Sequence, residues 1–222
     1  METDVKNPLN LDDEILKKIE TQAVSYTTLM AYYRCAIMEV ETKFNVLNEE
    51  LSIQYDRNPI ETVKSRLKKP RSIGEKLERL GIEVSVENIE KHLNDVAGVR
   101  VICSFPEDVY MLSDALLKQD DIRLIEKKDY IKNPKPNGYR SLHLIIGIPI
   151  FLAKEKREMR VEIQLRTIAM DFWASLEHRL NYKKDGHLTE EMAKELMDCA
   201  EMSAQLDRRM QTLRNLVENK ED

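Results

Sequence analysis

The segment RVEIQLRT, residues 160–167, carries the side chains in this chain that are best suited to chemistry. Its aliphatic residues alternate with polar ones, which is the period of a half-buried β-strand. The polar face of that strand would present Glu162 and Gln164 between two arginines. A carboxylate held among cations is the group that metal-assisted phosphoryl transfer needs. The alternative is an ordinary solvated sheet face, so the segment indicates a candidate site for a charged ligand.

The segment SRLKKPRSIGEKL, residues 65–77, is rich in cations. Lys76 follows Ser72 by one turn in a helix that we expect Ser72 to cap, and Arg66 and Lys68 add positive charge just before it. A capping hydroxyl, free backbone N–H groups and converging cations together bind polyphosphates. A solvated basic turn is the alternative. Neither GxxxxGK[ST] nor GxGxxG occurs, which argues against P-loop and Rossmann nucleotide sites.

The segment DVAGVRVIC, residues 95–103, places an acid directly before an apolar strand. Asp95 is of the type that holds Mg²⁺ bridging phosphates, although a simple helix-to-strand cap would also use an aspartate there. Arg100 lies in the middle of the strand. An arginine in so apolar a run needs an acid, a phosphate or a flat ring as a partner.

The segment KPNGYRSLH, residues 135–143, begins with a turn at Asn137-Gly138. Tyr139, Ser141 and His143 then share one face of the following strand. An aromatic ring beside a cation such as Lys135 can stack a base while the cation holds its phosphates. Edge packing of the tyrosine and a structural histidine are the alternatives. The four segments share one requirement, a nucleotide polyphosphate with Mg²⁺.

The elements that must position these residues form an α/β region between two long helices. Four strands are expected, near residues 96–105, 122–131, 140–150 and 159–167. Four helices are expected, two before the first strand near residues 72–82 and 84–93, one after it near 106–119, and one after the last strand near 168–182. Ser85 is expected as an N-cap, Pro106 at a helix start, and Phe172, Trp173 and Leu176 in the core. A mixed sheet clasped by helices is an α+β fold.

The two flanking helices carry heptad seams. The first seam is formed by apolar residues spaced alternately three and four apart: Met30, Tyr33, Ile37, Val40, Phe44, Leu47 and Leu51. The second occupies positions 192, 196, 199, 206, 210, 213 and 217, and Ser203 interrupts it. The seams could pack on each other, on the central region or on another subunit. We divide the chain into an N-terminal helical segment (1–56), an α+β domain (57–182) and a C-terminal helix (183–222).

Composition favours a globular, cytoplasmic protein. The 222 residues carry a net charge of −5, yet residues 57–79 are basic, which suggests a local anionic ligand. The three cysteines have neither disulfide nor zinc-ligand spacing, so a reducing compartment is expected. The acidic N-terminus has no apolar core of a signal peptide, and no apolar run reaches membrane-spanning length.

In their order along the chain, these four segments, with the DFWASLEHRLNY run at residues 171–182, resemble the synthetase domain of RelA/SpoT-type (p)ppGpp synthetases. The length and the flanking helices are similar to those of the small alarmone synthetases, which contain this domain alone. The resemblance implies a nucleotidyltransferase-like fold and a GTP pyrophosphokinase. Such an enzyme transfers pyrophosphate from ATP to the 3′-OH of GDP or GTP and makes the alarmones ppGpp and pppGpp of the stringent response.

The resemblance also implies roles for single residues. Those expected to bind ATP are Arg66, Lys68, Ser72, Lys76 and Arg100. Those expected to bind GDP or GTP are Lys135, Tyr139, His143, Gln164 and Asp171, with Tyr139 stacked on guanine. Glu162 would activate the 3′-OH, and Asp95 would bind Mg²⁺ with Glu162 as a second metal ligand. A homotetramer is implied, whereas RNA binding is not predicted.

Two features qualify this expectation. Asp171 stands where the family pattern favours asparagine, so its guanine contact is an open question. None of the four histidines is followed by aspartate, so we expect no hydrolase domain of the kind that the longer relatives carry. A catalytically silent nucleotide- or RNA-binding regulator on the same fold is the alternative function, and a helical interaction protein is a third.

Overall fold

The computed structural model describes residues 8–183 and 189–218. The helices within these ranges are α1 (Pro8–Tyr55), α2 (Pro70–Arg79), α3 (Val86–His92), α4 (Pro106–Leu117), α5 (Ile168–Lys183) and α6 (Glu190–Glu218). The strands are β1 (Ile60–Leu67), β2 (Ala97–Cys103), β3 (Arg123–Asp129), β4 (Leu142–Phe151) and β5 (Lys156–Thr167).

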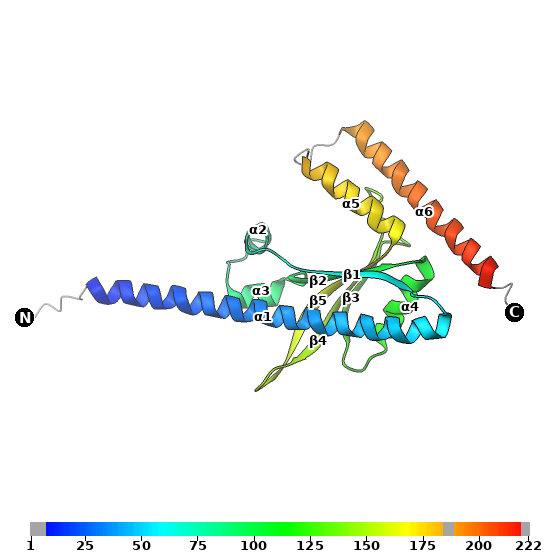
Figure 1. Cartoon of the computed structure of the whole chain (residues 1–222). Helices are drawn as coiled ribbons and strands as arrows, with labels where there is room; N and C mark the ends of the chain where they lie inside the picture. The colour runs from blue at the N-terminus through cyan, green and yellow to red at the C-terminus, as the bar shows by residue number, and fades with distance from the viewer. Residues whose placement is uncertain (1–7, 184–188, 219–222) are drawn as a thin grey trace, which may run out of the picture.

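The five strands form one mixed sheet in the order β1-β2-β5-β4-β3. β2 and β5 are parallel, and the other neighbouring pairs are antiparallel. Figure 1 shows α1 running along one face of the sheet, with α2 and the α5–α6 pair on the other side. This mixed sheet with two long helices confirms the expected α+β class.

The core lies between α1 and the sheet. All seven residues of the first heptad seam are between 0 and 7% exposed, and they join one hydrophobic cluster with the inward residues of β2, β4 and β5. The seam could have packed on the second seam, on the central region or on another subunit, and in the structure it packs on the central region. The seam therefore stabilises the domain and is not available as an interface.

Local sequence explains most element boundaries. The Ser85 hydroxyl accepts a hydrogen bond from Asn88 N at 3.1 Å and caps α3, as expected. Pro106 begins α4, also as expected. The expected cap at Ser72 is wrong, because α2 begins at Pro70 and Lys69 occupies the N-cap. A proline at the first helical position fixes the N-cap three residues earlier and puts Ser72 inside the first turn.

One strand was not expected. Residues 60–67 form the edge strand β1, which pairs antiparallel with β2. Arg66 therefore lies in a strand and not in a basic turn. The sheet gains one strand over the four that the sequence indicated.

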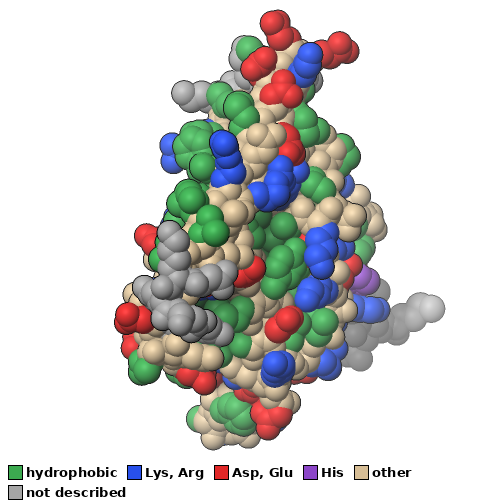
Figure 2. Space-filling model, turned by 90° about the vertical axis from the view of Figure 1, so that its right-hand side faces the viewer, with side chains coloured by type: hydrophobic (Ala, Val, Ile, Leu, Met, Phe, Trp, Pro, Cys, Tyr) green, Lys and Arg blue, Asp and Glu red, His purple; other side chains and the backbone are tan. Residues whose placement is uncertain are grey.

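α5 and α6 pack on each other around a small second cluster of Trp173, Ala174 and Ala200. Trp173 is buried as expected, but Phe172 and Leu176 are exposed, so their assignment to the core is wrong. Both line a groove of about 930 Å³ between the two helices. In Figure 2 hydrophobic side chains are visible among basic ones in the upper part of the molecule, where these helices lie.

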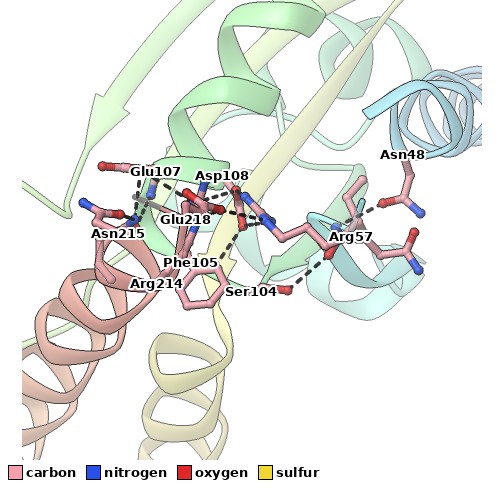
Figure 3. A network of polar contacts seen from close by, with 12 residues as sticks. Asn48, Arg57, Ser104, Phe105, Glu107, Asp108, Arg214, Asn215 and Glu218 are labelled. Atoms are coloured by element: carbon pink, nitrogen blue, oxygen red, sulfur yellow. Dashed lines mark hydrogen bonds and ion pairs between the residues drawn. The ribbon is translucent and has the colours of Figure 1, made fainter. Parts of the chain in front are cut away.

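The C-terminal part of α6 is held to α4 by a polar network (Figure 3). The Asp108 carboxylate, which is 1% exposed, accepts hydrogen bonds from Arg57 at 2.7 and 3.0 Å and from Arg214 at 3.4 Å. Both guanidiniums also lie over the Phe105 ring, at 5.5 and 5.3 Å from its centroid. In the described part of the chain, no helix combines the length and apolar character needed to span a membrane.

Candidate active site

The register of the sheet brings the predicted residues onto one face. Arg100 on β2 pairs with Gln164 on β5, which pairs in turn with His143 on β4. In the next row on the same face, Arg66 on β1 pairs with Gly98, and Gly98 pairs with Glu162. Residues paired across strands point to the same side of a sheet. The opposite side of β5, with Val161, Ile163 and Leu165, is fully buried, so the expected alternation is confirmed.

A cavity of about 300 Å³ opens over this face. Its lining comes from β1, β2 and β5: Lys64, Ser65, Arg66, Gly98, Val99, Arg100, Glu162 and Gln164. Gly98 has no side chain to fill the space beside Glu162. The cavity therefore has three cations along one side and one carboxylate, a composition suited to a polyanion that must approach an acid.

Glu162 is held in place from two sides. Gln164 Nε2 donates to Glu162 Oε2 at 3.1 Å, and His143 Nδ1 lies 3.4 Å from Glu162 Oε1. Burial alone would raise the pKa of Glu162, but the contacts with His143 and Gln164 outweigh it and bring the pKa below the ordinary value. Glu162 is therefore ionised at neutral pH in spite of its partial burial.

The hydrogen bonds around Tyr139 fix the tautomer of His143. The Tyr139 hydroxyl accepts from Ser141 Oγ at 3.0 Å and from Arg166 Nη2 at 2.6 Å, and it lies 2.8 Å from His143 Nε2. With both lone pairs used, the hydroxyl must donate its own hydrogen to Nε2. A neutral His143 then carries its proton on Nδ1, which faces Glu162. A continuous chain of hydrogen bonds thus joins the tyrosine to the catalytic candidate.

Asp95 lies between α3 and β2, next to two lysines. Asp95 Oδ2 accepts from Lys68 Nζ at 2.6 Å and pairs with Lys76 Nζ at 2.8 Å. Burial acts to raise the pKa of Asp95, but the two lysines outweigh it and the pKa is lowered. Asp95 Oδ1 is buried and has no hydrogen-bond partner among the described residues.

The unpartnered Oδ1 of Asp95 is a candidate ligand for the expected Mg²⁺. No group of three or more His, Cys, Asp and Glu able to hold a metal occurs in the described ranges. A Mg²⁺ ion shared with a nucleotide needs only one or two carboxylates, because phosphates and water supply its other ligands. The unpartnered Oδ1 of Asp95 and the ionised Glu162 fit that requirement.

The loop of residues 130–141 holds Lys135 against two aromatic rings. Lys135 Nζ lies 4.7 Å from the centroid of Tyr130 and 4.9 Å from that of Tyr139. Backbone hydrogen bonds from Lys135 N to Tyr139 O and from Gly138 N to Lys135 O close the turn between them. The expected pairing of an aromatic ring with a cation is present.

Arg166 was not among the residues predicted for the site, yet it contacts three of them, Gln164, Asp171 and Tyr139. It is 4% exposed, donates to Gln164 Oε1 at 2.8 Å, pairs with Asp171 at 3.1 Å and lies 5.0 Å from the centroid of Tyr139. Asp171 also contacts Arg100 at 3.3 Å, so the mid-strand arginine has an acid as its partner. The period of β5 was the available signal, because Arg166 continues the series of Glu162 and Gln164.

Comparison with known proteins now bears on the identity of the chain. The model for the region found in RelA/SpoT proteins matches residues 65–187. The chain belongs to the RelA/SpoT family. It is 41% identical over 200 residues to GTP pyrophosphokinase YwaC of Bacillus subtilis, covering 90% of this chain and 95% of that protein. It is 36% identical over 186 residues to GTP pyrophosphokinase YjbM of the same organism, covering 84% and 87%.

Solved structures of RelA/SpoT proteins agree with this assignment. The small alarmone synthetase 2 of Bacillus subtilis superimposes with a TM-score of 0.79 at 42% identity, covering 86% of this chain and 98% of that one. The small alarmone synthetase 1 of the same organism, bound to its product pppGpp, gives a TM-score of 0.79 at 34% identity and covers 86% and 97%. Both findings confirm the resemblance seen in the sequence. All twelve residues predicted for the site lie within the matched RelA/SpoT region.

Proposed function

We propose that this chain is a GTP pyrophosphokinase that transfers pyrophosphate from ATP to the 3′-OH of GDP or GTP. The observation that carries the proposal is the polar face of β5. It presents an ionised Glu162 with a cation-lined cavity on one side and, on the other, the aromatic loop of residues 130–141, hereafter the acceptor loop. The names of the relatives YwaC and YjbM support the same reaction, as does the product pppGpp bound to the small alarmone synthetase 1 of Bacillus subtilis.

The donor side would bind ATP. Arg66 and Arg100 line the cavity and would flank the adenine, since a guanidinium stacks well on a flat ring. The triphosphate would draw Lys68 and Lys76 away from Asp95 Oδ2, because it offers more negative charge than one carboxylate. Ser72, in the first turn of α2, would add a hydroxyl and neighbouring backbone N–H groups.

The acceptor side would bind GDP or GTP. Tyr139 would stack on guanine, and Lys135 would follow the acceptor phosphates. His143 and Gln164 would keep Glu162 directed at the ribose. Asp171 could accept from the guanine N–H groups, although its present contacts are with Arg100 and Arg166.

The chemical step needs one base and one leaving group. Glu162 would take the proton of the 3′-OH as the ribose oxygen bonds to the β-phosphorus of ATP. The bond from the β-phosphorus to the α,β-bridging oxygen breaks, and AMP leaves with its electron pair. The β- and γ-phosphoryl groups remain on the 3′-oxygen. Asp95 and Glu162 would hold Mg²⁺, and that ion would supply positive charge to neutralise the transferred phosphates.

Residues 57–182 would form this catalytic unit. The cytosol is the expected compartment, because all three cysteines are free thiols. The exposed apolar groove between α5 and α6 supports a homo-oligomer, for which we propose a tetramer.

Product analysis tests the function directly. The protein is incubated with Mg-ATP and either GDP, GTP or GMP, and the nucleotides are separated and identified by phosphorus NMR. We expect AMP and a guanosine 3′-pyrophosphate in equal amounts. The matched control is 3′-deoxy-GTP, which lacks the nucleophile and should give neither. Tight binding of both nucleotides without any product would instead support the silent regulator.

A further inference from the structure

The acceptor loop rests directly on α6 at Gly138. This residue has φ +86°, and a Cβ added to it would lie 2.6 Å from Ala200 Cβ and 3.1 Å from Met197 Sδ. Both distances are below normal van der Waals separation, so the loop backbone touches the helix with no space for a side chain. Ala200 is itself buried. The position of the loop is therefore limited by the size of the side chain at position 200.

Arg140, which follows Tyr139 in the chain, is also held by α6. Arg140 Nη2 donates to Glu201 Oε2 at 3.0 Å, and the second oxygen of Glu201 accepts from Arg208 at 2.8 Å. Gly138 and Arg140 are the two chain neighbours of Tyr139. Both contact consecutive residues of one helix, so the backbone that carries the tyrosine ring is fixed from outside the loop.

α6 is in turn anchored to the rest of the domain along its length. Trp173 Nε1 on α5 donates to Leu196 O at 2.8 Å. Thr167 Oγ1, at the end of β5, donates to Asp207 Oδ2 at 2.6 Å. Further along, Arg214 reaches Asp108 on α4 (Figure 3). These contacts fix α6 to β5, α4 and α5, so the helix that touches the acceptor loop is itself held by the rest of the domain.

We propose that α6 is a positioning element for the acceptor substrate, with Ala200 and Glu201 as positioning residues that act through Tyr139. The inference rests on the proposed function, because it assigns the acceptor to this loop. It predicts that changes on α6 alter acceptor binding and leave ATP binding unaffected. The donor site is built from β1, β2 and α2 and receives no contact from these two residues.

The first test is Ala200→Val, with Ala193→Val as its matched control. The control makes the same substitution at an exposed position of the same helix and so has the same intrinsic helix cost. GDP and ATP binding are measured separately by calorimetry, which does not depend on turnover. We expect Ala200→Val to weaken GDP binding by roughly tenfold, within the range that loss of a base stack produces. ATP affinity should match that of the control, whereas the melting temperature of Ala200→Val should be lower, because valine overpacks a buried position.

A second variant tests the inference in case Ala200→Val does not fold. Glu201→Gln keeps the size of the side chain but removes the charge that Arg140 contacts, and Glu195→Gln is its exposed control. We expect about a threefold loss of GDP affinity, typical of one partly exposed ion pair. GDP affinities of both α6 variants equal to those of their controls would overturn the inference, as would equal losses for GDP and ATP.

A double-mutant cycle shows whether the effect passes through the ring. In a Tyr139→Ala background, Ala200→Val should weaken GDP binding by less than twofold, because the positioned group is gone. A full tenfold loss in that background would contradict action through Tyr139. If the wild type binds GDP but forms no product, the proposed function fails while these binding comparisons still decide the present inference.

Discussion

At the scale of single residues, the site is a connected polar network. Arg166 contacts Tyr139, Gln164 and Asp171, and Gln164 contacts Glu162. Arg100, which we assign to the ATP side, joins this network through Asp171, so residues assigned to the two substrates share one set of hydrogen bonds. Such networks resist pairwise dissection, because removing one member leaves others unsatisfied.

Tyr139 has two separable functions in this account, stacking and hydrogen bonding. Tyr139→Ala should raise the KM for GDP or GTP about tenfold or more, since a base–aromatic stack contributes roughly 1–3 kcal/mol. Tyr139→Phe keeps the ring but removes the donor to His143, so KM should change little while kcat falls. Steady-state kinetics with each nucleotide varied in turn measure both. An equal rise in KM for ATP would show that Tyr139 supports folding and not the acceptor.

At the scale of elements, the sequence predicted what local period and turn chemistry determine. The alternation of β5, the cap at Ser85 and the helical period of α1 depend on neighbouring residues, and all are present. The partner of the α1 seam could not be predicted, because a seam can pack equally well on a sheet or on another helix. β1 was not predicted because only one of its residues is buried and its sequence shows no apolar alternation.

In the candidate site too, features set by local sequence could be predicted, and features set by contacts between distant elements could not. The segment containing Glu162 and Gln164 was predictable, because strand alternation alone puts both on one face. The lysine pairs at Asp95 and the bridging position of Asp171 depend on distances between elements far apart in sequence. No local pattern encodes such distances.

The contact between Asp207 on α6 and Thr167 at the end of β5 should make the stability of the fold depend on pH. Burial raises the pKa of Asp207, and the bond from Thr167 and the charges of Arg140 and Arg208 only partly oppose it. The folded state then binds this proton more tightly than the unfolded state, so the contribution of Asp207 to stability decreases as pH rises through the folded-state pKa.

Asp207→Asn keeps an acceptor for Thr167 without the buried charge. Its melting temperature at pH 7 should exceed that of the wild type by a few degrees, since about 1 kcal/mol corresponds to about 2–4 °C at this chain length. The difference should shrink toward pH 4. Thermal unfolding across pH, with the exposed Asp198→Asn as control, measures it. A variant that is less stable than wild type at pH 7 would contradict the assignment.

At the scale of the whole molecule, apolar surface is unevenly distributed. The α1 seam is buried, whereas α5 and α6 expose Phe172, Met202, Leu206 and Met210 around the groove of about 930 Å³. We expect an exposed apolar patch of this kind to be an interaction surface. Oligomer formation should therefore depend on α5 and α6 and not on the first heptad seam.

Light scattering at micromolar concentration should give the mass of a homo-oligomer, with a tetramer expected. Leu206→Glu places a charge in the groove and should dissociate it. Phe151→Glu, at an exposed site on β4, should leave the mass unchanged. A monomer mass for the wild type would refute the assembly.

The measurement that tests the central claim most directly compares turnover and binding in Glu162→Gln and Asp95→Asn. Glu162→Gln preserves volume and the contact with Gln164 but removes the base, so kcat should fall by about 10²–10⁴ while ATP affinity persists. Asp95→Asn should instead weaken binding of Mg-ATP, and added Mg²⁺ should partly restore its rate. A Glu162→Gln protein that folds, binds both nucleotides and turns over near the wild-type rate would contradict the proposal that the polar face of β5 is the catalytic surface.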